Sequence, residues 1–569
     1  MLNLQVGWHL EEIADLLELQ GANPHKIRAF RRAARKLASL SKPLDQVDLK
    51  TIPGIGEKIA EEVLIFLEKG ETPLLKNLLE NTPQTVLEIR EIPGIDLKTA
   101  YRIYRWGGIN KKEQLKKVVQ KRELRTIPGI GAKVEKDIKD FLQQTRERGH
   151  FLLSLAESEA EAFINRVENI PAVEKIGVTG AVRRGEELVD GINILLGTRE
   201  FKIARESISL LPRIKTRTVS EDFLLKLELP GGVPLKVKLV PPEEYALELI
   251  KTTGPTSHWD FLAKIAREKG FNLIDEGFFY GGKKVFFQEE KEIYTRLEMP
   301  YPPPEVRHRV LETGKDFSLV EKIIDFNEIK GDFHLHTRWS DGGSTIEEMV
   351  KKAQSLRYEY LVITDHSMAL EFAGGMSIAA LQEQMEYIER LNEKLGKKYV
   401  LTGIEADIEM DGSLDVPQRF LDRMDWVMAS IHRGLKLPRQ EMTKRLVRAV
   451  SHPEVRVLGH PTCRLFPNRD GIDVDLKEVF SSAAASGTAM EINGAPDRRD
   501  LGEELIHLAL EFGLEFCLGS DAHNDQNMEY MRYAVVEARR AGLPAHKIIN
   551  TKSFEDLPGK KLSRIGGEK

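Results

Sequence analysis

Hydrophobic and polar positions divide the chain into stretches with different patterns. The first 150 residues predict helices joined by short turns that contain glycine. From about residue 151 to residue 310 the pattern changes to mixed helix and strand, with strand-like segments at residues 192–196, 224–229 and 235–240. The last of these alternates apolar and polar residues, which predicts a strand with one buried face.

A different pattern begins after a proline-rich break at residues 300–304. Residues 305–330 predict a charged helical connector, and from Gly331 strand-like runs alternate with amphipathic helical stretches such as 346–356 and 378–395. Several of the strand-like runs end in histidine or acidic residues. Polar groups at strand ends, separated by helices, predict an α/β barrel with its active site on the carboxyl-end face.

Composition narrows the class of protein. At 569 residues the chain exceeds one hydrophobic core, so several domains are expected, α in the first part and α/β later. An evenly spread net charge of -5 would argue against nucleic-acid binding, but the charge is uneven. Residues 101–150 contain fourteen Lys and Arg against six Asp and Glu, and residues 26–36 contain six basic side chains. A basic helix face is most often simply solvated, so this signal alone is weak.

Cysteine usage and hydropathy indicate the compartment. The two cysteines, Cys463 and Cys517, exclude a disulfide scaffold and suit a reducing environment. Glu11 and Glu12 interrupt any signal-peptide core, and no apolar run approaches the length that spans a bilayer. We therefore expect a cytoplasmic protein without a membrane partner.

The first 150 residues contain an internal repeat. Ile-Pro-Gly-Ile occurs three times, each time as a tight turn that opens a helix and presents free backbone N–H groups to an anion. One such turn is usually an ordinary corner, whereas three beside a basic stretch favour nucleic acid. The turns resemble helix-hairpin-helix motifs, which hold DNA backbones, and the resemblance implies DNA contacts by Gly54, Gly56, Lys58, Gly94, Gly129, Gly131 and Lys133. In the second copy Asp96 replaces the last glycine.

The middle region resembles the palm of a family X DNA polymerase. The resemblance rests on Gly-Ala-Val-Arg-Arg-Gly at 180–185, Leu-Val-Pro-Pro-Glu at 239–243, Thr-Thr-Gly at 252–254, and residues 294–305. Together with the helix-hairpin-helix region it covers about the first 315 residues. It implies a nucleotidyltransferase-like palm and thumb, with Arg183 and Arg184 among the DNA contacts.

The carboxylates that nucleotidyl transfer requires are missing from the aligned positions. Two divalent ions must be held by hard oxygen ligands, yet alignment with the family places Gly191 and Asn193 at its Asp-x-Asp pair and Lys236 at its third aspartate. Asp190 is one residue out of register and faces the other side of its strand. The sequence therefore predicts a catalytically silent palm that serves as a DNA-docking scaffold.

The last 239 residues contain metal-binding side chains at close spacing. His334 and His336 are two residues apart, so on a strand they point to the same face, and the same geometry serves Asp521 and His523. A single histidine is usually structural, but ten such groups, several closing strand-like runs, predict a multinuclear metal site.

These motifs resemble the polymerase and histidinol phosphatase (PHP) domain, a distorted (β/α)7 barrel that carries up to three metal ions. The resemblance implies nine ligands: His334, His336, Asp341, His366, Glu405, His432, His460, Asp521 and His523. It groups His334, His336, Glu405 and Asp521 around one ion, Glu405, His432 and His460 around a second, and Asp341, His366 and His523 around a third. Nitrogen and oxygen ligands without thiolate suit Mn, Zn or Fe.

Two arginines beside the ligands are candidate catalytic residues. Arg433 follows His432, and Arg464 lies four residues after His460, where either could clamp a phosphate. A surface salt bridge is an equally good explanation for each. We expect Asp365 and Glu491 to orient ligands rather than bind metal.

These parts predict a metal-dependent phosphoesterase delivered to DNA by an inactive polymerase body. The resemblance implies 3'-5' exonuclease, 3'-end processing or abasic-site incision in DNA repair, on gapped or 3'-ended DNA. Three alternatives stay open: an active family X polymerase, a small-molecule phosphatase of the histidinol-phosphatase type, and a non-enzymatic DNA-bridging protein. The expected domains are residues 1–80, 81–150, 151–245 (palm), 246–315 (thumb), a linker at 316–330, and 331–569 (PHP).

Overall fold

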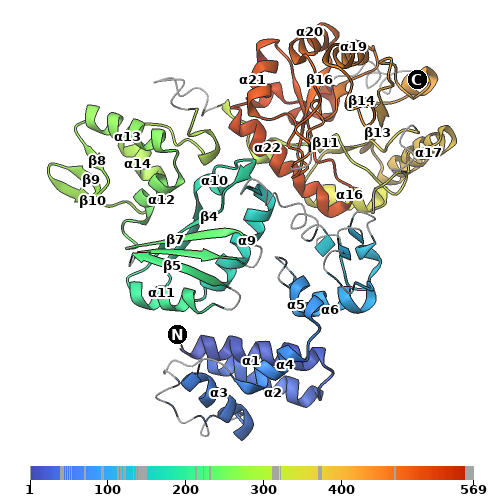
Figure 1. Ribbon diagram of the computed structural model, residues 1–569. Coiled ribbons are helices and arrows are strands. Elements are labelled where there is room, and N and C mark those ends of the chain that lie inside the picture. The colour runs from blue at the N-terminus through green and yellow to red at the C-terminus, as the bar shows by residue number, and fades with distance from the viewer. Residues whose placement is uncertain are drawn as a thin grey trace. The chain divides into compact units, whose positions relative to one another are not determined.

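The chain divides into two compact units in the computed structural model (Figure 1). The first contains Met1–Val182, Leu188–Thr253 and Gly270–Ile293, and the second contains Arg183–Glu187, Gly254–Lys269 and Tyr294–Lys569. The structure describes residues 2–38, parts of 44–138, 150–211, 214–221, 223–229, 232–309, 320, 322–368, 374–466 and 469–557.

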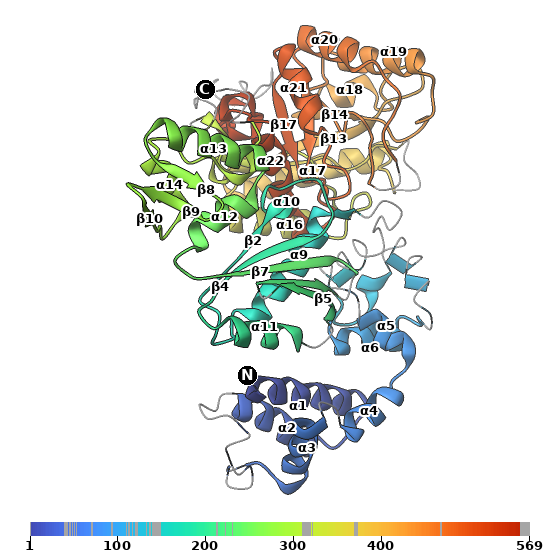
Figure 2. The same cartoon turned by 60° about the vertical axis from the view of Figure 1, so that its left-hand side comes forward.

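The N-terminal part of the first unit is helical, as the sequence predicts. Helices α2, α3 and α4 pack around α1 (Figure 2). The apolar residues Val6, Leu10, Ile13 and Leu17 of α1 recur on one face and are buried. The helices of this part are α1 Leu2–Leu19, α2 Pro24–Ala38, α3 Glu57–Lys69, α4 Pro73–Glu80, α5 Gln84–Arg90 and α6 Leu97–Trp106.

The rest of the first unit is built around a five-stranded sheet whose strand order is β2-β4-β7-β6-β5. The predicted strand with one buried face at 235–240 is confirmed, because Leu235, Val237 and Leu239 are buried while Lys236 is exposed. The elements here are β1 Phe151–Leu152, α9 Leu153–Val167, β2 Lys175–Thr179, α10 Gly180–Arg183, β3 Leu188–Val189, β4 Ile192–Gly197, α11 Phe201–Ser209, β5 Lys215–Glu221, β6 Leu224–Glu228, β7 Pro234–Val240 and α12 Tyr245–Thr253, followed by the small antiparallel sheet β8 Asn272–Ile274, β9 Gly277–Tyr280 and β10 Lys283–Val285.

Seven parallel strands form the barrel of the second unit, and each pairs with the next along the chain. A parallel bridge between Leu335 and Ala522, just beyond the first and last strands, brings the two edges together, so the barrel is nearly closed. This confirms the predicted α/β barrel. The strands are β11 Gly331–Asp332, β12 Tyr360–Ile363, β13 Val400–Asp407, β14 Trp426–Ser430, β15 Val457–Leu458, β16 Ala489–Asn493 and β17 Phe516–Gly519.

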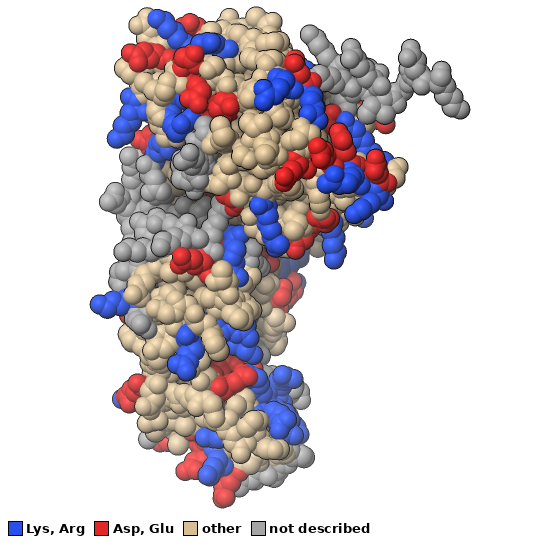
Figure 3. Space-filling model, turned by 90° about the vertical axis from the view of Figure 1, so that its right-hand side faces the viewer, with Lys and Arg blue, Asp and Glu red and all other residues tan. Residues whose placement is uncertain are grey.

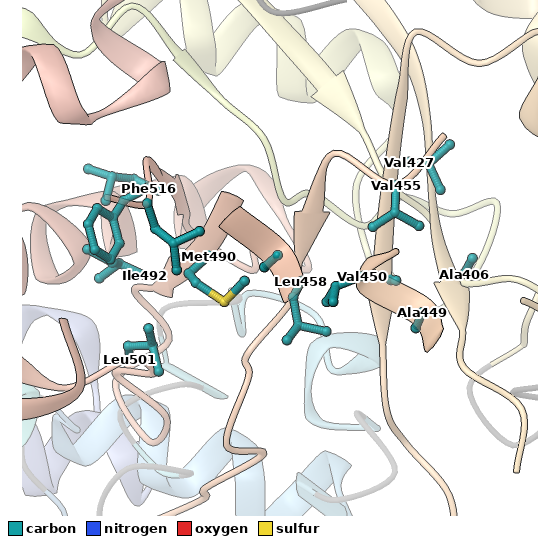
Figure 4. Packing of buried hydrophobic residues seen from close by; sticks show 14 of the residues in the cluster. Ala406, Val427, Ala449, Val450, Val455, Leu458, Met490, Ile492, Leu501 and Phe516 are labelled. Carbon is teal, nitrogen blue, oxygen red and sulfur yellow. The ribbon is translucent and has the colours of Figure 1, made fainter. Parts of the chain in front are cut away.

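Helices cover the strands of the barrel, so the strands are buried along their whole length (Figure 1). Figure 4 shows part of this core, where Leu458, Met490, Ile492 and Phe516 pack together. The helices of the second unit are α13 Thr256–Glu268, α14 Glu290–Arg296 (shared with the first unit), α16 Ile346–Ser355, α17 Ile378–Leu395, α18 Gln418–Leu421, α19 Arg439–Val450, α20 Leu476–Ser486, α21 Glu503–Glu511 and α22 Met531–Arg540.

Local sequence explains where the predicted barrel helices begin. Thr345 and Glu348 form a capping box at the start of α16, in which each side chain accepts the backbone N–H of the other residue. Ser377 caps α17 by accepting the backbone N–H of Ala380 with its side-chain hydroxyl. Residues 310–319 and 321 of the predicted connector lie outside the described residues; of its described C-terminal part, Val320 and Lys322 are helical and Phe326–Glu328 form a 3-10 turn, so the helical connector stays a prediction. None of the described helices has the length and apolarity needed to cross a bilayer.

Candidate metal centre

All nine candidate ligands lie at or just beyond the carboxyl ends of barrel strands. His334 and His336 follow β11, His366 follows β12, and Glu405 lies near the end of β13. Because parallel strands end at the same rim, residues distant in sequence converge there. The remaining ligands are His432 after β14, His460 after β15, Asp521 and His523 after β17, and Asp341 in the loop before α16.

Glu405 lies at the centre of the site. Its Oε2 atom is 3.5 Å from Nε2 of both His334 and His336, while its Oε1 atom is 3.4 Å from Nε2 of His432 and 3.0 Å from Nε2 of His460. One carboxylate therefore faces two groups of histidines, as expected of a bridging ligand.

Three groups of side chains have ligand atoms within 4.8 Å of one another. They differ from the expected grouping in four residues. His336 also joins the third group, and His366 also joins the second, with Nδ1 2.8 Å from Oε2 of Glu405, whereas Glu405 is absent from the first group and His460 from all three. The groups are His334, His336 and Asp521; His366, Glu405 and His432; and His336, Asp341, His366 and His523.

Buried ligand atoms without a hydrogen-bond partner show that these residues fit divalent ions. Nε2 of His334, both ring nitrogens of His336 and Nε2 of His432 are all in this state. Burying a polar atom without a partner is costly, and coordination of a cation removes that cost. Each of these atoms is a nitrogen donor of the type that Mn, Zn and Fe accept.

The pKa values of the buried ligands shift in both directions: against the effect of burial, Glu491 raises the pKa of His334, and Glu405 raises the pKa of His432 to about 9, so both imidazoles must release a proton to bind a cation. Burial opposes ionisation of Glu405, but the facing histidines His432, His334 and His366 outweigh it and hold its pKa well below the usual range. Burial and two neighbouring histidines lower the pKa of His336 to about 3, so its imidazole is neutral at physiological pH. Ionised carboxylates and neutral imidazoles are the ligand forms that bind a cation.

Carboxylates behind the ligands fix their orientation. Glu491 Oε1 lies 2.6 Å from Nδ1 of His334, and Asp407 Oδ1 lies 3.2 Å from Nδ1 of His432. Asp365 accepts hydrogen bonds from Thr337 and Gln384 instead of facing the ligand groups. The expected orienting position of Glu491 agrees with these contacts, whereas the sequence analysis missed Asp407.

The two predicted catalytic arginines are both held by carboxylates. Arg433 lies 2.9 Å from Asp407 and 3.1 Å from Glu409, and Arg464 forms an ion pair with Glu187. A phosphate-clamping role for either stays a prediction. The sequence analysis missed Arg498, whose Nε lies 3.3 Å from Oδ2 of Asp521. Its position just beyond β16, at the rim where the ligands converge, is the signal that could have found it.

The helix-hairpin-helix turns are described in part. Gly54 and Gly129 have φ of +89° and +79°, values that favour glycine, and a Cβ at Gly56 or Gly131 would meet nothing within 4 Å. Lys58 is exposed, while Gly94 and Lys133 lie outside the described residues.

The second turn differs from the other two. Asp96 caps α6 by accepting the N–H of Thr99 at 2.7 Å, so its carboxylate occupies the place of an external anion. Figure 3 shows basic side chains interspersed with acidic ones over the face in view, so charge alone does not single out a DNA-binding surface there.

Two of the three aligned palm positions lie on adjacent strands, and Gly191 directly precedes β4. Asn193 of β4 is paired with Lys236 of β7, and Lys226 of β6 is the partner of Lys236 on its other side. The side chain of Asp190 is 90% exposed, and its Oδ1 atom lies 3.1 Å from Nδ1 of His150. Arg184 donates to Glu186, and Arg183 ends α10; DNA contact by either arginine stays a prediction.

Comparison with known proteins agrees with this architecture. Family models match at residues 1–72 (helix-hairpin-helix domain), 86–144 (SAM-like helix-hairpin-helix tandem), 248–308 (DNA polymerase beta thumb) and 332–495 (PHP domain). The domain boundaries expected from the sequence stay predictions.

Curated relatives match either the whole chain or the barrel alone. The "DNA polymerase/3'-5' exonuclease PolX" of Bacillus subtilis (strain 168) is 30% identical over 556 residues, 96% of this chain and 97% of the relative. A "Probable phosphatase" of Thermoanaerobacter sp. (strain X514) is 29% identical over 254 residues, 42% of this chain and 97% of the relative. Fold and site thus define a PHP-type metallophosphoesterase joined to polymerase-like domains. The chain belongs to the PolX family of DNA polymerase/3'-5' exonucleases.

Proposed function

We propose that this chain is a divalent-metal-dependent 3'-5' exonuclease that processes DNA ends in repair, with the PHP barrel as its catalytic part. The observation that carries the proposal is the convergence of nitrogen and oxygen ligands on one rim of the barrel, where eight of the nine candidates form three groups and the ninth, His460, lies 3.0 Å from Glu405. The helix-hairpin-helix matches and the full-length relative support DNA as the substrate. Mn or Zn suits the donor set best, and Fe is also compatible.

The chemistry divides between bound ions and protein side chains. The candidate ligands would hold divalent ions, which would supply an activated water and positive charge for the phosphoryl oxygens, so no protein nucleophile would be needed. Glu491 and Asp407 hold the imidazoles of His334 and His432 in position. Arg498 supplies a positive charge beside Asp521, where a non-bridging phosphate oxygen can be bound.

We also propose that the palm does not polymerise. Two of the three positions for ion-binding carboxylates hold an amide and an ammonium group, Asn193 and Lys236, which are paired with each other across strands. The third, Gly191, has no room for a side chain, since a Cβ there would lie 2.6 Å from the carbonyl oxygen of Pro234. Within the described residues, the groups of three or more side chains able to hold an ion all come from the barrel.

Two alternatives have specific support. The name of the full-length relative includes DNA polymerase, and this comparison favours an active palm. The barrel's match to probable phosphatases favours a small phosphate monoester as substrate, although such a substrate leaves the helix-hairpin-helix turns without a role.

One experiment separates these functions. Labelled gapped and 3'-recessed DNA is incubated with Mn, with and without deoxynucleotides, and wild type is compared with His334→Ala plus His336→Ala. We expect shortening by wild type that disappears in the double variant, and no nucleotide addition by either. Primer extension by both proteins contradicts the silent palm, and faster turnover of p-nitrophenyl phosphate than of DNA favours the phosphatase.

A further inference from the structure

A short segment from the polymerase-like half belongs to the barrel's unit. Arg183–Glu187 is part of the second compact unit, although the residues on both sides of it in sequence belong to the first. The packing around it is tight. Gly185 has φ of +67°, and a Cβ at this position would collide with Val536 of α22.

Three arginines of the barrel domain bind this segment. Arg499 donates to the carbonyl oxygen of Gly185 at 2.9 Å, and Arg540 donates to that of Arg184 at 3.0 Å. Arg464 forms an ion pair with Glu187. These guanidinium groups are largely buried, and Arg499 is 1% exposed. The segment is therefore bound through both its backbone and a charged side chain.

One of these arginines, Arg464, is connected to the metal centre through Arg498. Arg464 lies in the loop that carries His460, and its Nε donates to the carbonyl oxygen of Arg498 at 2.7 Å. The side chain of Arg498 in turn lies 3.3 Å from Asp521. A chain of direct contacts thus runs from Glu187 through Arg464 and Arg498 to a candidate ligand.

We propose that Glu187 is a positioning residue of the phosphoesterase site, which acts by holding Arg464 and, through it, the His460 loop and the backbone at Arg498. The inference rests on the proposed function. A guanidinium that loses its carboxylate in a mostly buried place must find another partner, and Arg464 can do so only by moving. That movement displaces the carbonyl of Arg498 and the loop of His460 together. The barrel site is therefore completed by a residue that lies far outside the PHP sequence match.

The test compares two neighbouring glutamates of the segment in the full-length chain. Glu187→Gln removes the charge that faces Arg464, whereas Glu186→Gln is the matched control, because Glu186 pairs with Arg184 within the segment. We expect Glu187→Gln to lower kcat on 3'-recessed DNA about tenfold and to change KM by less than about twofold. Binding of Mn to the metal-free protein, measured by calorimetry, should weaken about tenfold. Glu186→Gln should match wild type in both measurements.

A double-mutant cycle identifies the route of the effect. If Glu187 acts through Arg464, then Arg464→Gln reduces activity as much as Glu187→Gln does, and the two changes together cost little more than either alone. Arg464→Lys keeps the charge but loses the second donor, so we expect it to lose activity too. Thermal unfolding of each variant excludes global destabilisation as the cause.

Two outcomes overturn the inference. The first is a folded Glu187→Gln protein whose kcat and Mn affinity equal those of wild type. The second is a double variant whose loss of activity equals the product of the losses of Glu187→Gln and Arg464→Gln. A wild-type chain that binds Mn but does not hydrolyse DNA overturns the proposed function instead, and Mn affinity of Glu187→Gln then decides the inference alone.

Discussion

The carboxylate of Glu491 lies 2.6 Å from Nδ1 of His334 and leaves Nε2 of that ring facing Glu405 and Asp521. Its second oxygen accepts the backbone N–H of His460 at 2.6 Å. One buried side chain therefore fixes two ligands that are more than a hundred residues apart in sequence.

Glu491→Gln should weaken metal binding without removing a ligand. The amide can orient so that it still contacts His334 or the N–H of His460, but it lacks the charge that strengthens both contacts. We expect about 10- to 100-fold loss of Mn affinity and of exonuclease activity, measured by calorimetry and by release of labelled nucleotides. Glu511→Gln, an exposed change at the end of α21, serves as the control. Equal Mn affinity in the two variants would show that Glu491 has no orienting role.

Gly191→Ala should destabilise the first unit. The added methyl group meets the carbonyl oxygen of Pro234 at 2.6 Å, and this atom belongs to the backbone of a neighbouring strand and cannot move aside alone. We expect a loss of about 1–3 kcal/mol, measured by urea unfolding. Gly56→Ala, whose Cβ meets nothing within 4 Å, should change stability little. If Gly191→Ala is as stable as Gly56→Ala, a carboxylate at position 191 is sterically possible and the argument for a silent palm weakens.

The sequence predicts the barrel well because its ligands are local features of strand ends. His334 and His336 follow β11, and Asp521 and His523 follow β17, so the parallel topology places them on one rim. The predicted strand alternation does not hold for Asp521, whose φ of +52° is not that of a strand. Partners that depend on tertiary packing carry no such signal. Asp407 contacts His432, and Glu187 contacts Arg464, only because packing of the core brings their segments together. No residue spacing in the sequence indicates either contact.

The charge of Asp96 should weaken DNA binding by the second helix-hairpin-helix turn. Its carboxylate caps α6, whereas the first and third turns have a glycine, Gly56 and Gly131, at the position of Asp96. Asp96→Asn keeps the cap and removes the charge, so we expect about two- to fivefold tighter binding of duplex DNA at low salt, measured by fluorescence anisotropy. Glu80→Gln, at the C-terminal end of α4, removes the same charge elsewhere and should have a smaller effect. Identical affinities of the two variants would place the second turn away from the DNA.

Mild acid should destabilise the N-terminal helices through His9. The ring of His9 stacks on Phe66 with centroids 4.2 Å apart and lies 3.2 Å from the hydroxyl of Thr72. Burial lowers the pKa of His9 to about 4, against the weaker opposing effect of Glu12. Between about pH 6.5 and pH 4 the unfolded chain therefore binds a proton that the folded chain does not, so this contribution to stability is complete above pH 6.5 and is lost as the pH falls.

The loss through His9 should reach up to about 3 kcal/mol at pH 4, measured as the free energy of unfolding of the helical signal in urea. His9→Gln does not titrate, so its stability should depend less steeply on pH over the same interval. Burial also raises the pKa of Glu62, which lies 3.7 Å from His9, and protonation of Glu62 stabilises the fold in acid and partly offsets the loss. Because Glu62 is present in both proteins, the difference between their pH profiles isolates His9. Parallel profiles for wild type and His9→Gln would mean that the imidazole is hydrated in the folded protein.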